Sequence, residues 1–82
     1  KGVSYMTDLQ IKAFDRSGLL ADITGVVTEA KLSVKAINAR ANKDNTATIN
    51  MTLAINDTTQ LNQLIKKLKT VESVSEVYRM KG

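Results

Sequence analysis

The chain has no cysteine, no histidine, no proline and no tryptophan, and its aromatic residues are two tyrosines and one phenylalanine. Without cysteine and histidine it has no disulfides, no thiol nucleophile, no zinc site of the usual kind and no imidazole acid–base chemistry. No apolar run approaches the roughly 20 residues that span a bilayer. We therefore expect a cytoplasmic domain that uses no metal and no cofactor and does not associate with membranes.

The length of 82 residues is enough for one core but too short for a deep, enclosed active site. Twelve basic and eight acidic residues give a net charge of +4, which is less basic than a dedicated nucleic-acid binder. The chain starts at Lys1 and takes on a structured pattern within a few residues. We expect residues 1–82 to be a single domain of a longer polypeptide.

The spacing of apolar residues predicts six elements. Alternation of apolar and polar residues predicts strands at 5–14, 32–42, 47–55 and 74–80. Apolar residues spaced by three and four predict helices at about 18–31 and 58–71. A polar turn at 43–45 joins the middle strands, and the run from Asp57 to Gln60 is typical of a capping box.

This β-α-β-β-α-β order predicts a fold of the α+β class. Right-handed crossovers place both helices on one face of a four-stranded antiparallel sheet, which is the ferredoxin-like arrangement. The strands are apolar on one side only, so the other face of the sheet is expected to stay uncovered.

The most informative segment runs from Ala13 to Thr24. A strand ends on a charged pair, turns at Gly18 and enters a helix whose first N–H groups suit a small carboxylate or other anion. Asp15 and Ser17 are the candidates for the N-cap of that helix.

Three segments resemble the ACT domains, which are small ligand-sensing regulatory modules. Segment 15–24 has their Asp-Arg-x-Gly-Leu-Leu-x-x-Ile-Thr pattern, and segments 33–38 and 74–79 match as well, so the resemblance covers nearly the whole chain. The sequence of the first segment is most similar to that of the C-terminal ACT domain of the long Rel/Spo enzymes, the GTP pyrophosphokinase family. These enzymes make and hydrolyse guanosine tetra- and pentaphosphate in the bacterial stringent response.

The resemblance implies regulation rather than catalysis in this chain. A non-catalytic ACT domain of a (p)ppGpp synthetase/hydrolase would sense an amino acid or a partner and modulate the enzyme. ACT domains also pair side by side, which implies a homodimer through this domain. The Rel/Spo parentage implies contact with ribosomal RNA or tRNA in the parent protein, and an RNA-contacting module without amino-acid binding is the alternative function.

Six residues are candidates for ligand binding, and four of them have a purely structural alternative. Gly18 lets a carboxylate approach or relieves crowding, Asp15 accepts from a ligand ammonium or caps the helix, and Arg16 clamps an anion or is solvated. The remaining candidates are Leu19 and Leu20, whose apolar surroundings favour a branched-chain amino acid, and Asn38, which lies near a partner subunit or on an open sheet face.

A basic helix face is the candidate for RNA or partner contact. It consists of Lys66, Lys67 and Lys69, and the alternative is that these side chains are only solvated. An RNA-recognition motif has the same element order, but aromatic residues are missing from the strand positions that stack bases. An acylphosphatase-like enzyme is disfavoured because Asp15, next to Arg16, would repel phosphate.

Overall fold

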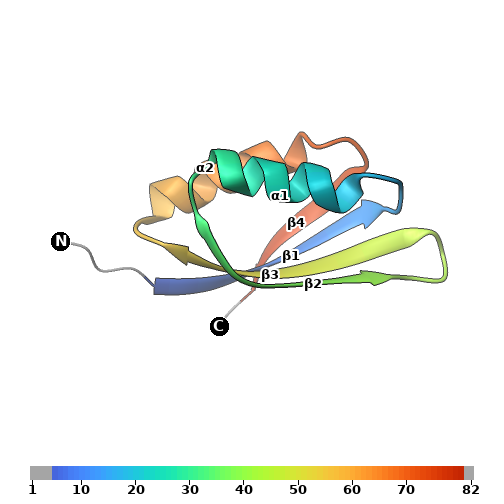
Figure 1. Ribbon diagram of the computed structural model, residues 1–82, viewed down its shortest axis with the longest axis horizontal. Helices are drawn as coiled ribbons and strands as arrows, with labels where there is room; N and C mark the ends of the chain where they lie inside the picture. The colour runs from blue at the N-terminus through green and yellow to red at the C-terminus, as the bar shows by residue number, and fades with distance from the viewer. Residues whose placement is uncertain (1–4, 81–82) are drawn as a thin grey trace.

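The computed structural model describes residues 5–80, and it has the predicted order of elements. The elements are β1 (Tyr5–Phe14), α1 (Leu19–Glu29), β2 (Ser33–Ala41), β3 (Thr46–Ile55), α2 (Thr58–Lys69) and β4 (Val74–Met80). Both helices lie on one face of a single sheet (Figure 1), which confirms the predicted ferredoxin-like α+β sandwich. Within residues 5–80, neither helix is long and apolar enough to cross a bilayer.

The strands follow the order β2-β3-β1-β4 and are antiparallel to their neighbours. The two inner strands, β1 and β3, are in register over their whole length, so that Leu9 lies opposite Met51 and Ile11 opposite Ile49. Because directly opposite residues share a face, the apolar sets of both inner strands point toward the helices together. This face carries the core.

The core is built from the two inner strands and the two helices. Its buried apolar residues are Leu9, Ile11, Ala13, Leu19, Ile23, Val27, Ala47, Ile49, Met51, Leu53, Ile55, Leu61, Leu64 and Leu68. The edge strand β4 contributes partly buried valines, whereas every residue of β2 is exposed. The alternation predicted for 32–42 is present, but it does not bury either face of that strand.

Helix α1 begins without a side-chain cap. Its N-cap residue is Gly18, in the left-handed conformation, so the prediction that Asp15 or Ser17 caps the helix is wrong. The helix also ends at Glu29, earlier than predicted. Lys31 has a φ of 61°, and its N–H donates to the carbonyl of Thr28, which closes the last turn.

Helix α2 begins with the predicted cap. The Asp57 carboxylate accepts from the backbone N–H of Gln60 at 2.9 Å. The Gln60 side chain reaches back to the N–H of Asn56 at 3.1 Å, one residue earlier than in the usual capping box. The helix ends at Lys69, and the Thr70 hydroxyl donates to the carbonyl of Lys67.

No helix covers the opposite face of the sheet, as predicted, and the middle of this face is polar. Gln10 of β1 donates to the side chain of Asn50 on β3 at 3.2 Å, and Thr52 donates to Asp8 at 2.7 Å. These cross-strand bonds pair polar side chains that no helix covers. Toward its ends the same face carries exposed apolar and aromatic side chains, among them Met6, Phe14 and Met80.

Candidate functional site

A hollow of about 420 Å³ lies beside the turn between β1 and α1, in the size range of small-molecule sites. The start of α1 forms one side, with Gly18, Leu19 and Leu20. The β2 residues Ala39, Arg40 and Ala41 form the other side, and β3 contributes Ala47 and Ile49. The hollow is therefore apolar at its base and lined at its rim by the N-terminal end of a helix.

The backbone conformation at position 18 favours glycine. Its φ of 78° lies in the left-handed region, which residues with a Cβ adopt only at a cost. A Cβ at this position would meet only Nη1 of Arg16, at 3.9 Å, so crowding does not explain the glycine. This conformation turns the chain from β1 into α1 and sets the rim of the hollow.

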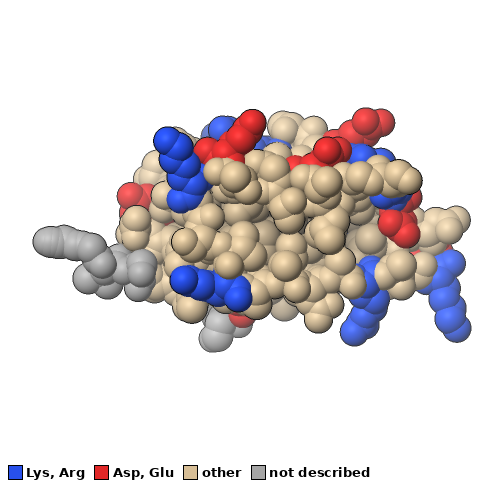
Figure 2. Space-filling view, viewed as in Figure 1, with Lys and Arg blue, Asp and Glu red and all other residues tan. Residues whose placement is uncertain are grey.

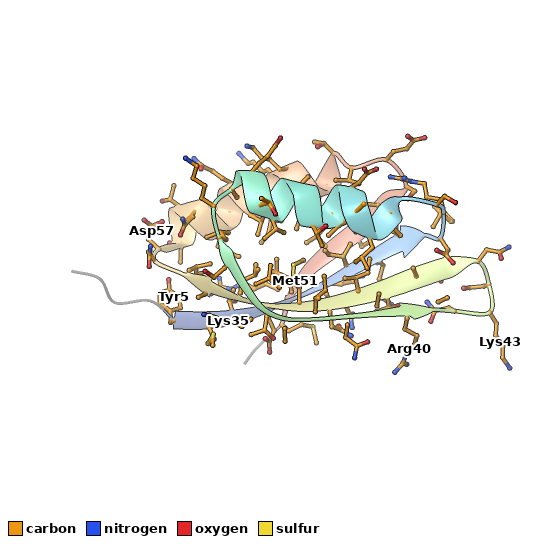
Figure 3. All side chains as sticks on the ribbon, in the orientation of Figure 1. Tyr5, Lys35, Arg40, Lys43, Met51 and Asp57 are labelled. Atoms are coloured by element: carbon orange, nitrogen blue, oxygen red, sulfur yellow. The ribbon has the colours of Figure 1, made fainter. Side chains whose placement is uncertain are left out.

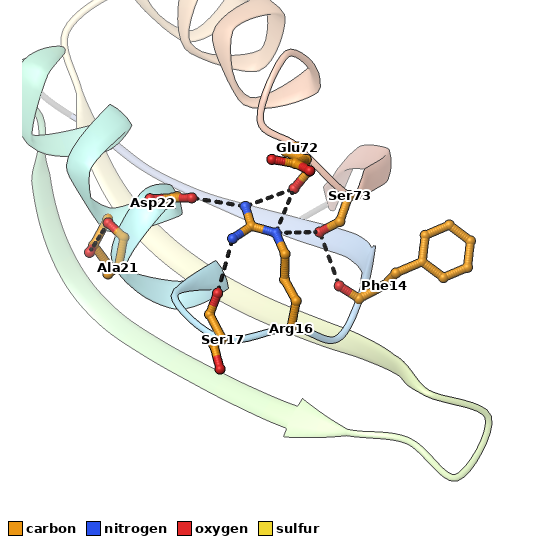
Figure 4. A network of polar contacts seen from close by, with 8 residues as sticks. Phe14, Arg16, Ser17, Ala21, Asp22, Glu72 and Ser73 are labelled. Carbon is orange, nitrogen blue, oxygen red and sulfur yellow. Dashed lines mark hydrogen bonds and ion pairs between the residues drawn. The ribbon is translucent and has the colours of Figure 1, made fainter.

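Arg16 is held by hydrogen bonds within the protein rather than left free for an anion (Figure 4). Nη2 forms an ion pair with Asp22 at 2.8 Å and donates to the carbonyl of Glu72 at 2.9 Å. Nε donates to the hydroxyl of Ser73 at 3.2 Å, and Nη1 donates to the carbonyl of Ser17 at 3.1 Å. We call these five residues the Arg16 network.

The Arg16 network ties the rim of the hollow to the loop between α2 and β4. Ser73, with a φ of 78°, exchanges two further bonds with Phe14: its carbonyl accepts from the Phe14 N–H and its hydroxyl donates to the Phe14 carbonyl. On the other side, the N–H of Asp15 donates to the carbonyl of Asn45 at 2.8 Å. The turn is thus fixed by segments far away in the sequence.

The structure brings five of the six candidate ligand residues together at the hollow: Asp15, Arg16, Gly18, Leu19 and Leu20. Leu19 is buried in the core, whereas the Leu20 side chain is 42% exposed. Asn38 does not line the hollow, because the register places it opposite Asn50 on the open face of the sheet.

Sequence reasoning missed two parts of the site. Ala39 and Ala41 line the hollow, and the alternation of small residues after Ile37 was a signal that pointed to one face of β2. Glu72 and Ser73 reach Arg16 from more than fifty positions away, and no local pattern in the sequence indicates that contact.

Asp44, an acidic residue with a shifted pKa, lies outside the hollow, at the turn between β2 and β3. The Thr46 hydroxyl donates to the Asp44 carboxylate and lowers the pKa of that group below its ordinary value. Burial opposes this shift, and Lys12 adds to it through its charge. Among residues 5–80, no cluster of acidic residues is arranged to hold a metal ion.

The three lysines singled out for RNA or partner contact lie in the last turn of α2 and are exposed. Cations are favourable there because the carbonyl end of a helix carries partial negative charge. Helix stability therefore accounts for their position, and their contact with RNA or a partner stays a prediction. They do not line the hollow.

The fold and the hollow define a class of protein: a small α+β module with a ligand-sized hollow beside its first strand-to-helix turn. The model of the ACT domain family matches residues 1–79, and the chain belongs to this family.

The relatives of this chain include enzymes named GTP pyrophosphokinase. The enzyme of Escherichia coli K12 is 35% identical over 79 residues, and that of Streptomyces coelicolor is 30% identical over 76. These matches cover 95% and 93% of this chain but only 11% and 9% of the two enzymes, so the chain spans about a tenth of their length. The crystal structure of the ACT domain from GTP pyrophosphokinase of Chlorobium tepidum is 27% identical, with a TM-score of 0.85, and covers 95% of this chain and 100% of that one.

Proposed function

We propose that this ACT domain regulates a GTP pyrophosphokinase of the Rel/Spo type, and that it senses a small amino acid bound in the hollow beside α1. The relatives support the first part, because they are GTP pyrophosphokinases of which this segment is about a tenth. The hollow supports the second part, since it joins a helix N-terminus to an apolar base. The proposal assigns no catalytic step to this chain.

The amino-acid main chain would sit at the rim of the hollow. The N–H of Leu19 donates to the carbonyl of Arg16 at 3.3 Å, and no side chain caps α1, so the next N–H groups of the first turn, those of Leu20 and Ala21, have no acceptor within the helix. These groups suit a carboxylate, which the positive end of the helix also favours. The exposed carboxylate of Asp15, on the same rim, suits the ammonium group of the ligand.

The ligand side chain would lie over the apolar base. Leu20 presents a branched, partly exposed side chain there, and Ala39 and Ala41 leave room beside it. A valine, leucine or isoleucine side chain buries apolar area against these alanines and Leu20. The observation that carries the proposal is this pairing of an uncapped helix end with an apolar hollow.

Amide NMR of the labelled domain during titration with valine, leucine and isoleucine tests the proposal. We expect saturable shifts at residues 15–20 and 39–41. Ala39→Leu fills the hollow and should abolish them, whereas Ala36→Leu, the same change on the opposite face of β2, should leave them intact. An absence of shifts at millimolar ligand would contradict direct sensing.

Two expectations about partners stay predictions: a homodimer through this domain, and contact of Lys66, Lys67 and Lys69 with ribosomal RNA or tRNA. If the amino acids cause no shifts while an RNA oligonucleotide shifts the end of α2, the alternative function as an RNA-contacting module replaces amino-acid sensing.

A further inference from the structure

The Arg16 network joins the hollow to the loop between α2 and β4, which consists of residues 70–73. Arg16 lines the hollow, and its Nη1 donates to the carbonyl of Ser17 at the rim. On the other side, Nε and Nη2 donate to the carbonyl of Glu72 in the loop, at 3.2 and 2.9 Å (Figure 4). A single side chain therefore contacts both the proposed amino-acid site and a second surface of the domain.

The guanidinium of Arg16 has one N–H group left for a ligand. An arginine side chain carries five N–H donors. Within residues 5–80, the network uses the N–H of Nε, both of Nη2 and one of Nη1, and Asp22 pairs with Nη2 rather than with Nη1. Nη1 lies 3.9 Å from the point where a Cβ of residue 18 would stand, beside the rim of the hollow. Its second N–H is therefore placed to meet a carboxylate at the rim.

Arg16 is also the arginine on the helix side of the hollow. Arg40 lines the hollow from β2, but its side chain points away from the helices (Figure 3). The backbone N–H groups of Leu20 and Ala21, which lack acceptors within α1, follow directly on Gly18 and its contact with Nη1. A carboxylate that accepts from these N–H groups lies on the side of the hollow where Arg16 is.

Such a carboxylate would compete with the loop for Arg16. A hydrogen bond to a charged acceptor is stronger than one to a neutral acceptor. The ligand would offer a charged carboxylate, whereas the loop offers the carbonyl of Glu72 and the hydroxyl of Ser73. Contact with the ligand should therefore draw the guanidinium toward the hollow and weaken its bonds to the loop.

The loop has a backbone conformation that depends on these bonds. Ser73 has a φ of 78°, a left-handed conformation that a residue with a Cβ keeps only where its surroundings hold it. The bonds that hold it are the one from Arg16 and the two that it exchanges with Phe14. Loss of the bond from Arg16 should therefore loosen the loop.

We propose that Arg16 couples the hollow to the loop between α2 and β4, so that a bound amino acid loosens residues 72–74. The coupling depends on the proposed amino-acid site and adds the path by which its occupancy changes another surface. Glu72 is exposed. Figure 2 shows acidic side chains at this end of the molecule, where the loop lies in Figure 1. The change would thus occur on a surface that a neighbouring domain or protein can contact.

Amide NMR of the labelled chain tests the coupling, with valine, leucine and isoleucine as the probes. We expect saturable shifts at residues 72–74 together with those at residues 15–20. The amide of Phe14, which donates to the carbonyl of Ser73 at 2.9 Å, should exchange its hydrogen faster when the ligand is bound. Arg16→Lys keeps the charge but loses the planar fork, so it should keep the shifts at the rim and lose those in the loop. The amide spectrum of the variant establishes that it is folded.

Two serine variants separate the coupling from general effects on β4. Ser73 and Ser75 each donate to a carbonyl of β1 at 3.0 Å, but of the two only Ser73 also accepts from Arg16. Because coupling between two sites is reciprocal, removal of an acceptor in the loop should favour the contact of Arg16 with the ligand. Ser73→Ala should raise the affinity for the amino acid about two- to fivefold, the equivalent of one hydrogen bond. Ser75→Ala should leave the affinity unchanged.

The failure of the coupling differs from the failure of the amino-acid site itself. Saturable shifts confined to residues 15–20 and 39–41 would overturn the coupling and leave the site standing, whereas no saturable shift at millimolar ligand would overturn both. Equal affinities of the two serine variants, or a lower affinity of Ser73→Ala, would show that the loop and the ligand do not compete for Arg16. Loop shifts that persist in Arg16→Lys would assign the coupling to the backbone instead.

Discussion

The neighbouring strands β2 and β3 show how the same sequence pattern leads to different environments. Both alternate apolar with polar residues, and both carry an isoleucine on the helix side of the sheet. Ile49 of β3 is 1% exposed, whereas Ile37 of β2 is 39% exposed. The alternation reports which side of a strand faces the helices. Whether that side is covered depends on the position of the strand in the sheet.

Truncation of these two isoleucines should give the largest effect and the sharpest test of the comparison. Ile49→Ala removes buried methyl groups and should lower the free energy of unfolding by about 2–4 kcal/mol. Ile37→Ala should lower it by less than about 1 kcal/mol, since much of this side chain is already in water. Urea unfolding followed by circular dichroism measures both. Equal losses would mean that something covers β2 in solution.

The two arginines near the hollow extend the comparison to polar residues. Arg16 lies in a network of backbone and side-chain acceptors, whereas Arg40 points away from the helices on the edge strand. Arg16→Lys keeps the charge but loses the planar fork, and should lower stability by about 1–2 kcal/mol. Arg40→Lys should change it by less than about 0.5 kcal/mol.

We expect the ion pair of Arg16 with Asp22 to contribute less to stability than the hydrogen bonds of Arg16 to the loop between α2 and β4. The side chains of Arg16 and Asp22 are 26% and 56% exposed, so solvent screens their attraction. Asp22→Asn should therefore destabilise the protein less than Arg16→Lys does. Thermal unfolding of the three variants ranks them, and a larger loss for Asp22→Asn would make the ion pair the main contribution.

Substitution by alanine should change the free energy of unfolding in opposite directions at Gly18 and Gly25. Gly18→Ala places a Cβ on a residue with a φ of 78° and should destabilise the protein by about 1 kcal/mol. Gly25→Ala, within α1, meets no atom within 4 Å and should stabilise it by about 0.5–1 kcal/mol through helix propensity. Urea unfolding of both variants measures the two changes in stability. Destabilisation at both positions would mean that α1 packs more closely around Gly25 than the structure shows.

The fold was predictable because it depends on short-range patterns. Strand alternation, helix spacing and the cap at Asp57 each involve residues within a few positions of one another, and each agrees with the structure to within a few residues. The uncapped start of α1 was not predicted, because Ser17 and Asp15 both have the side chains of a cap. The left-handed conformation of Gly18 takes the N-cap position instead.

Only the part of the site that one contiguous segment forms could be predicted from the sequence. The turn at Gly18 and the two leucines after it follow from one contiguous segment. The role of Arg16 depends on Glu72 and Ser73, which only the packing of β4 beside β1 brings near. The exposure of β2 also depends on strand order, which the alternation of its own residues does not encode.

The smallest expected effect concerns β4, the other edge strand. The Tyr78 hydroxyl donates a hydrogen bond to the Glu76 carboxylate, and this bond raises the pKa of Tyr78 above its ordinary value near 10. Since the folded-state pKa is the higher one, this bond stabilises the fold below pH 10 and is lost as the pH rises through the folded-state value. Glu76→Gln should lower the pKa of Tyr78 toward its ordinary value, as measured by near-ultraviolet absorbance against pH. An unchanged titration would mean that water, rather than Glu76, binds the Tyr78 hydroxyl in solution. The polar side chains of both edge strands, β2 and β4, would then be solvated.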